Sequence, residues 1–391
     1  MNRSFIARNP SVLIFLAILA LFTLGVTVLS EGFGIGLIST SFVKVLGKTL
    51  CLCLIAIAMD LIWGYAGILS LGHFAFFGLG GYMIGMWLMY ERTRQIVVNS
   101  LSDGVLPPTP EEITAGIGNQ IFGVVGSSDF PLIWAFADSL VLQLAFVVLV
   151  PGILALVFGW LAFRSRVTGV YLSILTQAMT LGLSLYLFQN ASGLRGNNGL
   201  SGLQNLPGIT APQSVVSLWF FWASALALGL GYLLVAWVVS GKFGSVIRGI
   251  RDNEARVRFL GYSVETYKLA VFTLTACISG IAGALYYPQA GIINPAEVAP
   301  IASIYLAVWV AIGGRGRLYG AVIGTAFVSL VSSWFTGGQA PDVPLGFYTV
   351  KWVDWWLVLL GLSFVLVTLY APNGIGGLID LLKRKRKETD A

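Results

Sequence analysis

The sequence predicts an all-α membrane protein, a polytopic helical bundle of about 8–10 transmembrane helices with some of the helices broken. Of the 391 residues, 57% are apolar and only 10% are charged, whereas an ordinary soluble domain has about 25% charged residues. The apolar residues form long unbroken runs, unlike the alternating pattern of barrel strands. Since each helical crossing needs roughly 20 apolar residues, the chain has room for about ten crossings.

About ten apolar runs are the candidate crossings. The first, residues 11–29, follows Arg3 and Arg8 and lacks a convincing signal-peptide cleavage site, so we interpret it as a retained span. The run at 301–313 is too short for a full crossing and predicts a half-helix or a re-entrant piece. The other runs lie at about residues 39–63, 64–90, 132–163, 167–189, 216–240, 267–290, 318–335 and 352–371.

The basic residues indicate the orientation, because cytoplasmic loops of membrane proteins carry an excess of lysine and arginine. When the spans alternate from a cytoplasmic N-terminus, one side collects the basic clusters Arg3/Arg8, Arg164/Arg166, 242–258, Arg315/Arg317 and Lys383–Lys387. Both termini are then expected in the cytoplasm. Lys44 and Lys48 fit poorly, since they fall near the outer face, and we interpret them as snorkelling side chains.

The chain is expected to form a single transmembrane domain over residues 1–391 in contact with membrane lipid. Residues 91–131 include Pro107, Pro108 and Pro110 and predict a periplasmic insert, and residues 380–391 predict a basic cytoplasmic tail. Residues 241–266 predict a cytoplasmic loop. The net charge of +6 follows from this topology and does not indicate binding to nucleic acid.

Small residues at helical spacing predict close contacts between helices. In lipid no hydrophobic force drives one helix against another, so glycines that let backbones approach supply the contact energy. The candidates for this packing role are Gly81, Gly85, Gly316, Gly320 and Gly324.

The sequence gives no support for an enzyme, a metal site or a cofactor. The cysteines lie inside apolar runs, and the single histidine, His73, has no cysteine or paired carboxylate near it in the sequence. Gly47-Lys48-Thr49 resembles the end of a phosphate-binding loop, but Phe42 stands where that pattern needs a glycine. We therefore expect no catalytic residue, and any ATP must be hydrolysed by a partner subunit.

Four polar residues are candidates for a solute pathway, namely Asp60, His73, Asn197 and Asn198. Asp60 lies in the apolar stretch AIAMDLIWGYAG, where an ionisable side chain is costly and usually functional. It serves either as an acceptor for a donor-rich solute or as an anchor that caps backbone amides at a helix break. The two asparagines suit a neutral solute, although their glycine-rich loop is also typical of a plain turn, and His73 is also typical of helix packing.

Residues 241–268 carry the clearest extramembrane signal. Val246, Ile250, Val257 and Leu260 recur at roughly helical spacing among charged residues and are followed by Gly261, which is typical of a helix end. A short amphipathic helix between two spans can dock into a groove on a cytosolic partner. The alternative is a simple basic loop.

Three long motifs resemble the permeases of the branched-chain amino-acid type of ABC importer: residues 64–82, 248–286 and 310–327. Within that family the chain is similar to urea ABC transporter permeases, on the basis of Asp60 and residues 158–178, 196–200 and 286–297. The resemblance implies an ABC importer permease fold and alternating access. It implies as partners a second homologous permease subunit, two cytosolic ATP-binding subunits and a periplasmic solute-binding protein.

By the same resemblance, the segment around residues 248–261 couples the permease to an ATPase subunit. The coupling residues that it implies are Arg248, Arg251, Asp252, Asn253, Glu254, Arg256 and Gly261. The expected function is import of urea or short amides across the inner membrane. Import of branched-chain amino acids is the alternative within the family, and a passive urea channel is the alternative from another class.

Overall fold

The computed structural model describes residues 10–101, 109–123, 131–167, 169–337, 343–344, 349–370 and 374–377. This part of the chain is almost entirely helical, which confirms the predicted fold class. Its strands are two-residue pieces that form two antiparallel pairs, β1 (Leu200–Ser201) with β2 (Ile292–Ile293) and β3 (Val343–Pro344) with β4 (Thr349–Val350). The predicted basic tail, residues 380–391, lies outside the described residues.

Ten helices form the bundle in the described part of the chain. They are α2 (Pro10–Leu29), α3 (Thr40–Asp60), α4 (His73–Leu101), α6 (Leu140–Arg164), α7 (Val170–Phe188), α8 (Gln213–Ser240), α10 (Val264–Ala290), α11 (Pro300–Gly313), α12 (Leu318–Thr336) and α13 (Trp352–Tyr370). Seven, all but α4, α11 and α13, are long and apolar enough to cross a membrane. Helix α11 has 14 residues and is about 21 Å long, which agrees with the half-helix predicted at 301–313.

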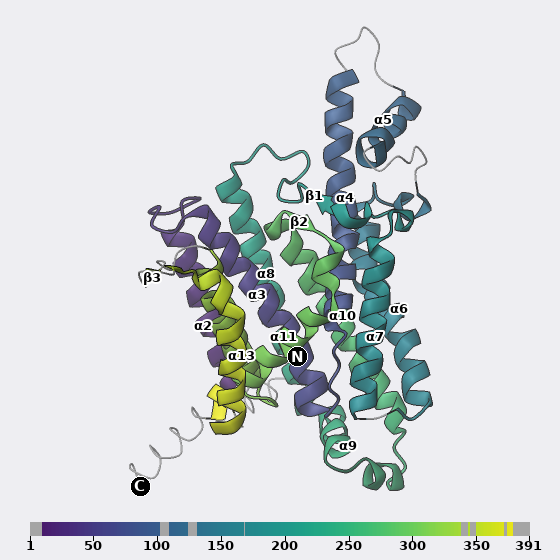
Figure 1. The fold of residues 1–391 in the computed structure, drawn as a ribbon, viewed down its shortest axis with the longest axis vertical. Coiled ribbons are helices and arrows are strands. Elements are labelled where there is room, and N and C mark those ends of the chain that lie inside the picture. The colour runs from purple at the N-terminus through teal and green to yellow at the C-terminus, as the bar shows by residue number, and fades with distance from the viewer. Residues whose placement is uncertain are drawn as a thin grey trace.

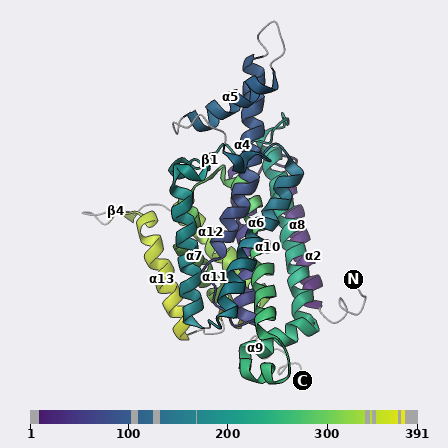
Figure 2. The same cartoon turned by 90° about the vertical axis from the view of Figure 1, so that its right-hand side faces the viewer.

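Helices α3 and α10 form the centre of the bundle, since α3 packs on α8, α10 and α12, while α10 also packs on α4 and α6. In α3 with its extension to Tyr65, 83% of the most apolar 18-residue stretch is buried inside the protein. In α2 the buried share of the corresponding stretch is only 11%. Figures 1 and 2 show α9 (Lys242–Phe259) across one end of the bundle and α5 (Pro110–Phe122) beyond the opposite end. We call these the α9 end and the α5 end.

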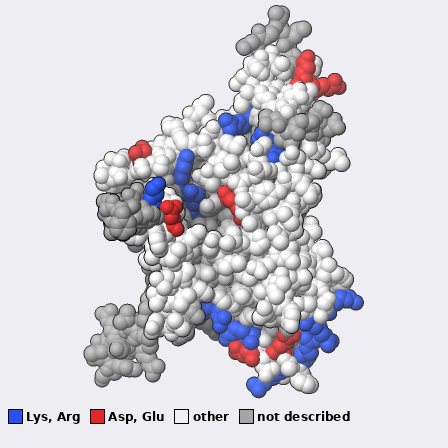
Figure 3. Space-filling model, in the orientation of Figure 1, with Lys and Arg blue, Asp and Glu red and all other residues white. Residues whose placement is uncertain are grey.

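The surface between the two ends fits a lipid environment. Figure 3 shows charged side chains over the α9 end and others scattered over the half nearer the α5 end, with a band almost free of charged side chains between these two regions. Large apolar side chains such as Leu21 on α2 and Val141 on α6 are 70% and 76% exposed. In water such a surface would aggregate, so it is expected to face hydrocarbon.

Glycines bring the helix backbones into contact. A Cβ atom at Gly81 would overlap the ring of Tyr287, and one at Gly85 would lie 3.2 Å from Leu200 Cδ1. On α12, a Cβ atom at Gly320 would lie 2.6 Å from the carbonyl oxygen of Gly313, and one at Gly324 would lie 2.6 Å from that of Trp309.

Gly316 differs from the other candidates for packing. It lies in the turn between α11 and α12, with φ of +78°, so it shapes the turn rather than a helix face. This is a left-handed conformation that glycine adopts without strain.

The predicted insert at residues 91–131 is largely helical where it is described. Its first part continues α4 to Leu101, and α5 packs back on α4, where Gly116 meets Val97. Helix α5 begins with a capping box, in which Thr109 and Glu112 each accept the other's backbone N–H.

Candidate functional site

Helix α9 contains the residues expected to couple the protein to a partner. Its φ and ψ at Asn253 are −159° and 96°, so it consists of two helical arms, residues 242–252 and 254–259, that meet at this residue. The side-chain oxygen of Asn253 accepts the backbone N–H of Arg256 at 3.0 Å and caps the second arm. Gly261, with φ of +87°, follows the end of the helix as the sequence predicted. The break at Asn253 was not predicted.

The apolar face of α9 points inward, which corrects the sequence-based expectation. Ile250 and Val257 are buried with Val264 of α10, and Val246 packs on the same cluster. These residues therefore attach α9 to α10 instead of presenting a face to a partner. Only Leu260 of the predicted set is exposed, at 71%, beside Phe259 at 92%. We call Phe259 and Leu260 the α9 tip.

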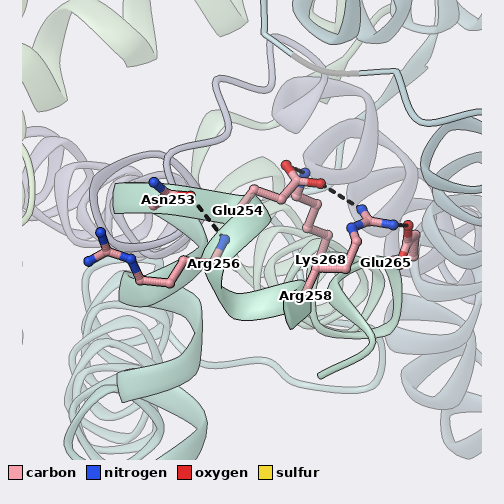
Figure 4. A network of polar contacts seen from close by, with 6 residues as sticks. All are labelled: Asn253, Glu254, Arg256, Arg258, Glu265 and Lys268. Atoms are coloured by element: carbon pink, nitrogen blue, oxygen red, sulfur yellow. Dashed lines mark hydrogen bonds and ion pairs between the residues drawn. The ribbon is translucent and has the colours of Figure 1, made fainter. Parts of the chain in front are cut away.

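Ion pairs join the second arm of α9 to the first turns of α10 (Figure 4). Glu254 accepts from Arg258 at 3.0 Å and from Lys268 at 2.6 Å, and Arg258 also pairs with Glu265 at 2.8 Å. Glu265 and Glu254 raise the pKa of the Arg258 guanidinium above its ordinary value by hydrogen bonding to it. The Lys268 side chain is only 10% exposed, so its pair with Glu254 is less screened than an ordinary surface pair. The side chain of Arg256 points away from this network in Figure 4.

The first arm of α9 is joined to the end of α3. The π-helix η1 (Leu61–Tyr65) continues α3, and Arg251 Nη1 donates to the Gly64 carbonyl oxygen at 2.9 Å. Arg251 Nε also pairs with Asp252 at 3.0 Å. The stem of Arg251 covers Gly67, where φ is +74° and a Cβ atom would lie 2.6 Å from Arg251 Cγ.

Asp60 joins α3 to the turn between α11 and α12. It is fully buried, and its Oδ1 accepts the backbone N–H of Gly316 at 2.7 Å. A Cβ atom at Gly64 would lie 2.8 Å from Gly316 Cα, so the two backbones can meet only because residue 64 is glycine. Of the two interpretations that the sequence left open, this contact corresponds to the anchor, at a turn distant in sequence. We call Arg251–Gly64 and Asp60–Gly316 together the α3 contacts.

The other predicted pathway residues lie on different elements from Asp60. His73 is fully buried at the start of α4, and neither ring nitrogen meets a hydrogen-bond partner among the described residues. Asn197 and Asn198 are exposed in the 3-10 helix η5 (Gly196–Asn198), close to the β1–β2 pair at the α5 end. The structure therefore does not bring the four residues together.

Two cavities open beside α9. One of about 400 Å³ is lined by residues 66–69, 169–170, 172–173 and 250–254 and by Lys268. The other, of about 370 Å³, contains Arg248 together with Arg317 and Tyr232. Arg248 thus lies apart from the ion pairs of the second arm. Among the residues that the structure describes, no cluster of His, Cys, Asp or Glu has the composition of a metal site.

A family model described as "branched-chain amino acid transport system / permease component" matches residues 41–368. The chain belongs to this family. It is accordingly an ABC-type permease subunit and a multi-pass protein of the inner membrane. Permeases of this family work with ATPase and binding-protein components.

Curated relatives support the same family. The high-affinity branched-chain amino acid transport system permease protein LivM of Escherichia coli (strain K12) is 21% identical over 361 residues, which cover 87% of this chain and 71% of LivM. The autoinducer 2 import system permease protein LsrC of Escherichia coli (strain K12 / DH10B) is 28% identical over 187 residues, 46% of this chain and 53% of LsrC. No solved structure matches the chain significantly.

Sequence reasoning missed Lys268, Glu265 and Gly64 as members of the site. Lys268 is a cation at the start of an apolar run, which is itself a signal of a paired charge. Gly64 contributes a carbonyl oxygen, and backbone groups leave no signal of their own in a sequence.

Proposed function

We propose that this chain is the permease subunit of an ABC importer that moves urea or short amides across the inner membrane by alternating access. A second homologous permease subunit would complete the translocation path, and a periplasmic protein would deliver the solute. Two cytosolic ATP-binding subunits would supply the energy, one of them at α9. The α9 end would then be cytoplasmic, together with both termini, as the distribution of basic residues favours.

The observation that carries this proposal is the construction of α9. Its tip exposes Phe259 and Leu260, an apolar pair next to Arg258 that suits an apolar groove on a cytosolic partner. The rest of α9 is attached to the bundle by Glu254–Lys268 and by Arg251–Gly64, and Asp60–Gly316 then joins α3 to the α11–α12 turn. A force on the tip would therefore reach α10, α3 and the α11–α12 turn through direct polar contacts.

The choice of urea is supported by the resemblance of residues 196–200 and 286–297 to urea permeases. Branched-chain amino acids are the second candidate, because the similarity to LivM extends over 87% of this chain. A passive channel is the candidate from another class. It would not need a helix that is attached at several points and ends in an exposed apolar tip.

The test uses the permease in liposomes with the companion subunits from its own operon and the matching binding protein. ATP hydrolysis is measured with urea and with leucine. Stimulation by urea alone is the expected result, and stimulation by leucine alone would move the substrate to amino acids. No stimulation by either solute, with urea still crossing ATP-free vesicles, would overturn the importer assignment.

The variant Phe259→Ser tests the docking role of the tip. We expect it to lose stimulation, because it removes the apolar side chain that enters the ATPase groove. Ile292→Ser, at the α5 end and 40% exposed, is the matched control and should keep stimulation. Full stimulation of Phe259→Ser would show that the ATPase docks elsewhere.

A further inference from the structure

A second group of polar residues lies inside the bundle, away from α9. Lys48 is on α3, about 12 Å along the helix from Thr40, and therefore well inside the half of the bundle that faces the α5 end. Its neighbour Gly47 meets Gln289 of α10, because a Cβ atom at Gly47 would overlap Gln289 Oε1. Lys48 and Gln289 therefore lie at the same depth.

Two buried polar atoms near this level have no hydrogen-bond partner among the described residues. They are the hydroxyl of Tyr82, in a fully buried residue, and the Oε1 atom of Gln289, which is 5% exposed. The amide of Gln289 is held firmly, since its Nε2 donates to Ser224 Oγ at 2.9 Å and to the Leu285 carbonyl oxygen at 2.7 Å. Buried polar atoms are almost always paired in proteins, so unpaired ones indicate a missing ligand or water. The hydroxyl of the fully buried Tyr287 has the Glu297 carboxylate as its neighbour.

Glu297 adds a carboxylate to the same place. It is in the 3-10 helix η6 (Pro295–Val298), which is fixed by the pairing of Ile293 with Leu200 and by Val298 against Gly78 of α4. The charge of Glu297 interacts with Lys48 and with the Tyr287 hydroxyl.

We propose that Lys48, Tyr82, Tyr287, Gln289 and Glu297 form a solute-binding patch for an uncharged ligand with an NH₂–C=O group, such as urea or a short amide. This proposal deepens the proposed function and rests on it. The residues come from α3, α4, α10 and η6, so a relative movement of these elements would open or close the patch.

The chemistry of the patch matches such a ligand. The Glu297 carboxylate and Gln289 Oε1 accept hydrogen bonds from NH₂ groups, while the Lys48 ammonium and the tyrosine hydroxyls donate to a carbonyl oxygen. The charges of Lys48 and Glu297 cancel, so the patch favours neither a net anion nor a net cation. A zwitterionic amino acid would use the same two charges, and the test therefore includes leucine.

The experiment measures the KM of ATP-driven uptake into liposomes that contain the complete complex, with urea, acetamide and leucine as probes. Tyr287→Phe deletes one hydroxyl, and Glu297→Gln keeps the shape of the side chain but removes its charge. We expect each variant to raise the KM for urea by about tenfold or more, because Tyr287→Phe removes a hydrogen-bonding group and Glu297→Gln replaces an acceptor oxygen by an NH₂ donor. Glu91→Gln, in an exposed pair with Arg94 at the α5 end, is the control and should keep the wild-type KM.

The outcomes separate this inference from the proposed function. Wild-type complex that fails to accumulate any of the three probes with ATP would overturn the proposed function itself. Urea uptake with unchanged KM in both variants would overturn the patch alone. Variants that raise KM only for leucine would overturn the assignment to amides. Co-purification of each variant with the ATPase subunits shows that it has folded.

Discussion

At the scale of single residues, the most informative side chain is Asp60. A buried carboxylate in a transmembrane helix is costly unless its oxygens accept hydrogen bonds. Here Oδ1 accepts from the Gly316 N–H, in a turn that would otherwise leave that donor buried and unsatisfied. Oδ1 therefore joins α3 to the α11–α12 turn, while Oδ2 has no hydrogen-bond partner among the described residues.

Substitutions at Asp60 distinguish an anchor from a solute ligand. Asp60→Asn keeps an acceptor oxygen and should retain most of the stability and transport. Asp60→Ala leaves the Gly316 N–H unsatisfied and should destabilise the fold by about 1–3 kcal/mol, measured by thermal unfolding of the purified permease. If Asp60→Asn abolished urea uptake without loss of stability, the charge would be needed for transport and the anchor role would be insufficient.

Gly67 and Gly261 form a matched pair for testing the contact with α9. Both have positive φ, but only Gly67 has a neighbour in the way, the side chain of Arg251. Gly67→Ala should displace Arg251 from the Gly64 carbonyl and uncouple ATP hydrolysis from uptake. Gly261→Ala should cost only about 1 kcal/mol of backbone strain and keep coupling. Equal effects of the two variants on the ratio of urea transported to ATP hydrolysed would refute the coupling role of Arg251.

At the scale of the element, α9 shows what the sequence could and could not predict. Its helical periodicity and its end at Gly261 were predictable, because both are local properties. The break at Asn253 was not, since it depends on an asparagine cap that competes with helix continuation. The direction of the apolar face also depends on α10, because periodicity identifies a face but not the surface that covers it.

The ion pair between Glu254 and Lys268 is expected to be strongly coupled. Glu254→Gln leaves the Lys268 charge unpaired at 10% exposure, so it should lower the stability by more than an exposed pair does. Adding Lys268→Met removes that charge and should restore part of the loss. Thermal unfolding of the single and double variants gives a coupling energy, expected at about 1 kcal/mol. The pair Glu91–Arg94, in which the arginine side chain is 52% exposed, serves as the control. Equal coupling energies in the two pairs would show that the burial of Lys268 adds nothing.

At the scale of the whole molecule, the sequence predicted the helical bundle and the short α11 because hydrophobic length is set by the bilayer. It did not predict which polar residues share a site. Asp60 and Asn198 were expected on one pathway, yet they lie towards opposite ends of the bundle. Conversely, Lys48 and Glu297 are almost 250 positions apart in the sequence and meet only through the packing of α3 with α10 and η6.

The central claim is that α9 couples ATP hydrolysis to import through contacts made by Arg251 and Glu254. The most direct measurement is the accumulation of labelled urea in liposomes that contain the full complex, with ATP supplied, for wild type and for the double variant Arg251→Ala/Glu254→Ala. Wild type should concentrate urea above the external level, and the double variant should not exceed equilibrium. Concentrative uptake by the double variant at the wild-type rate would show that these contacts do not couple ATP hydrolysis to import.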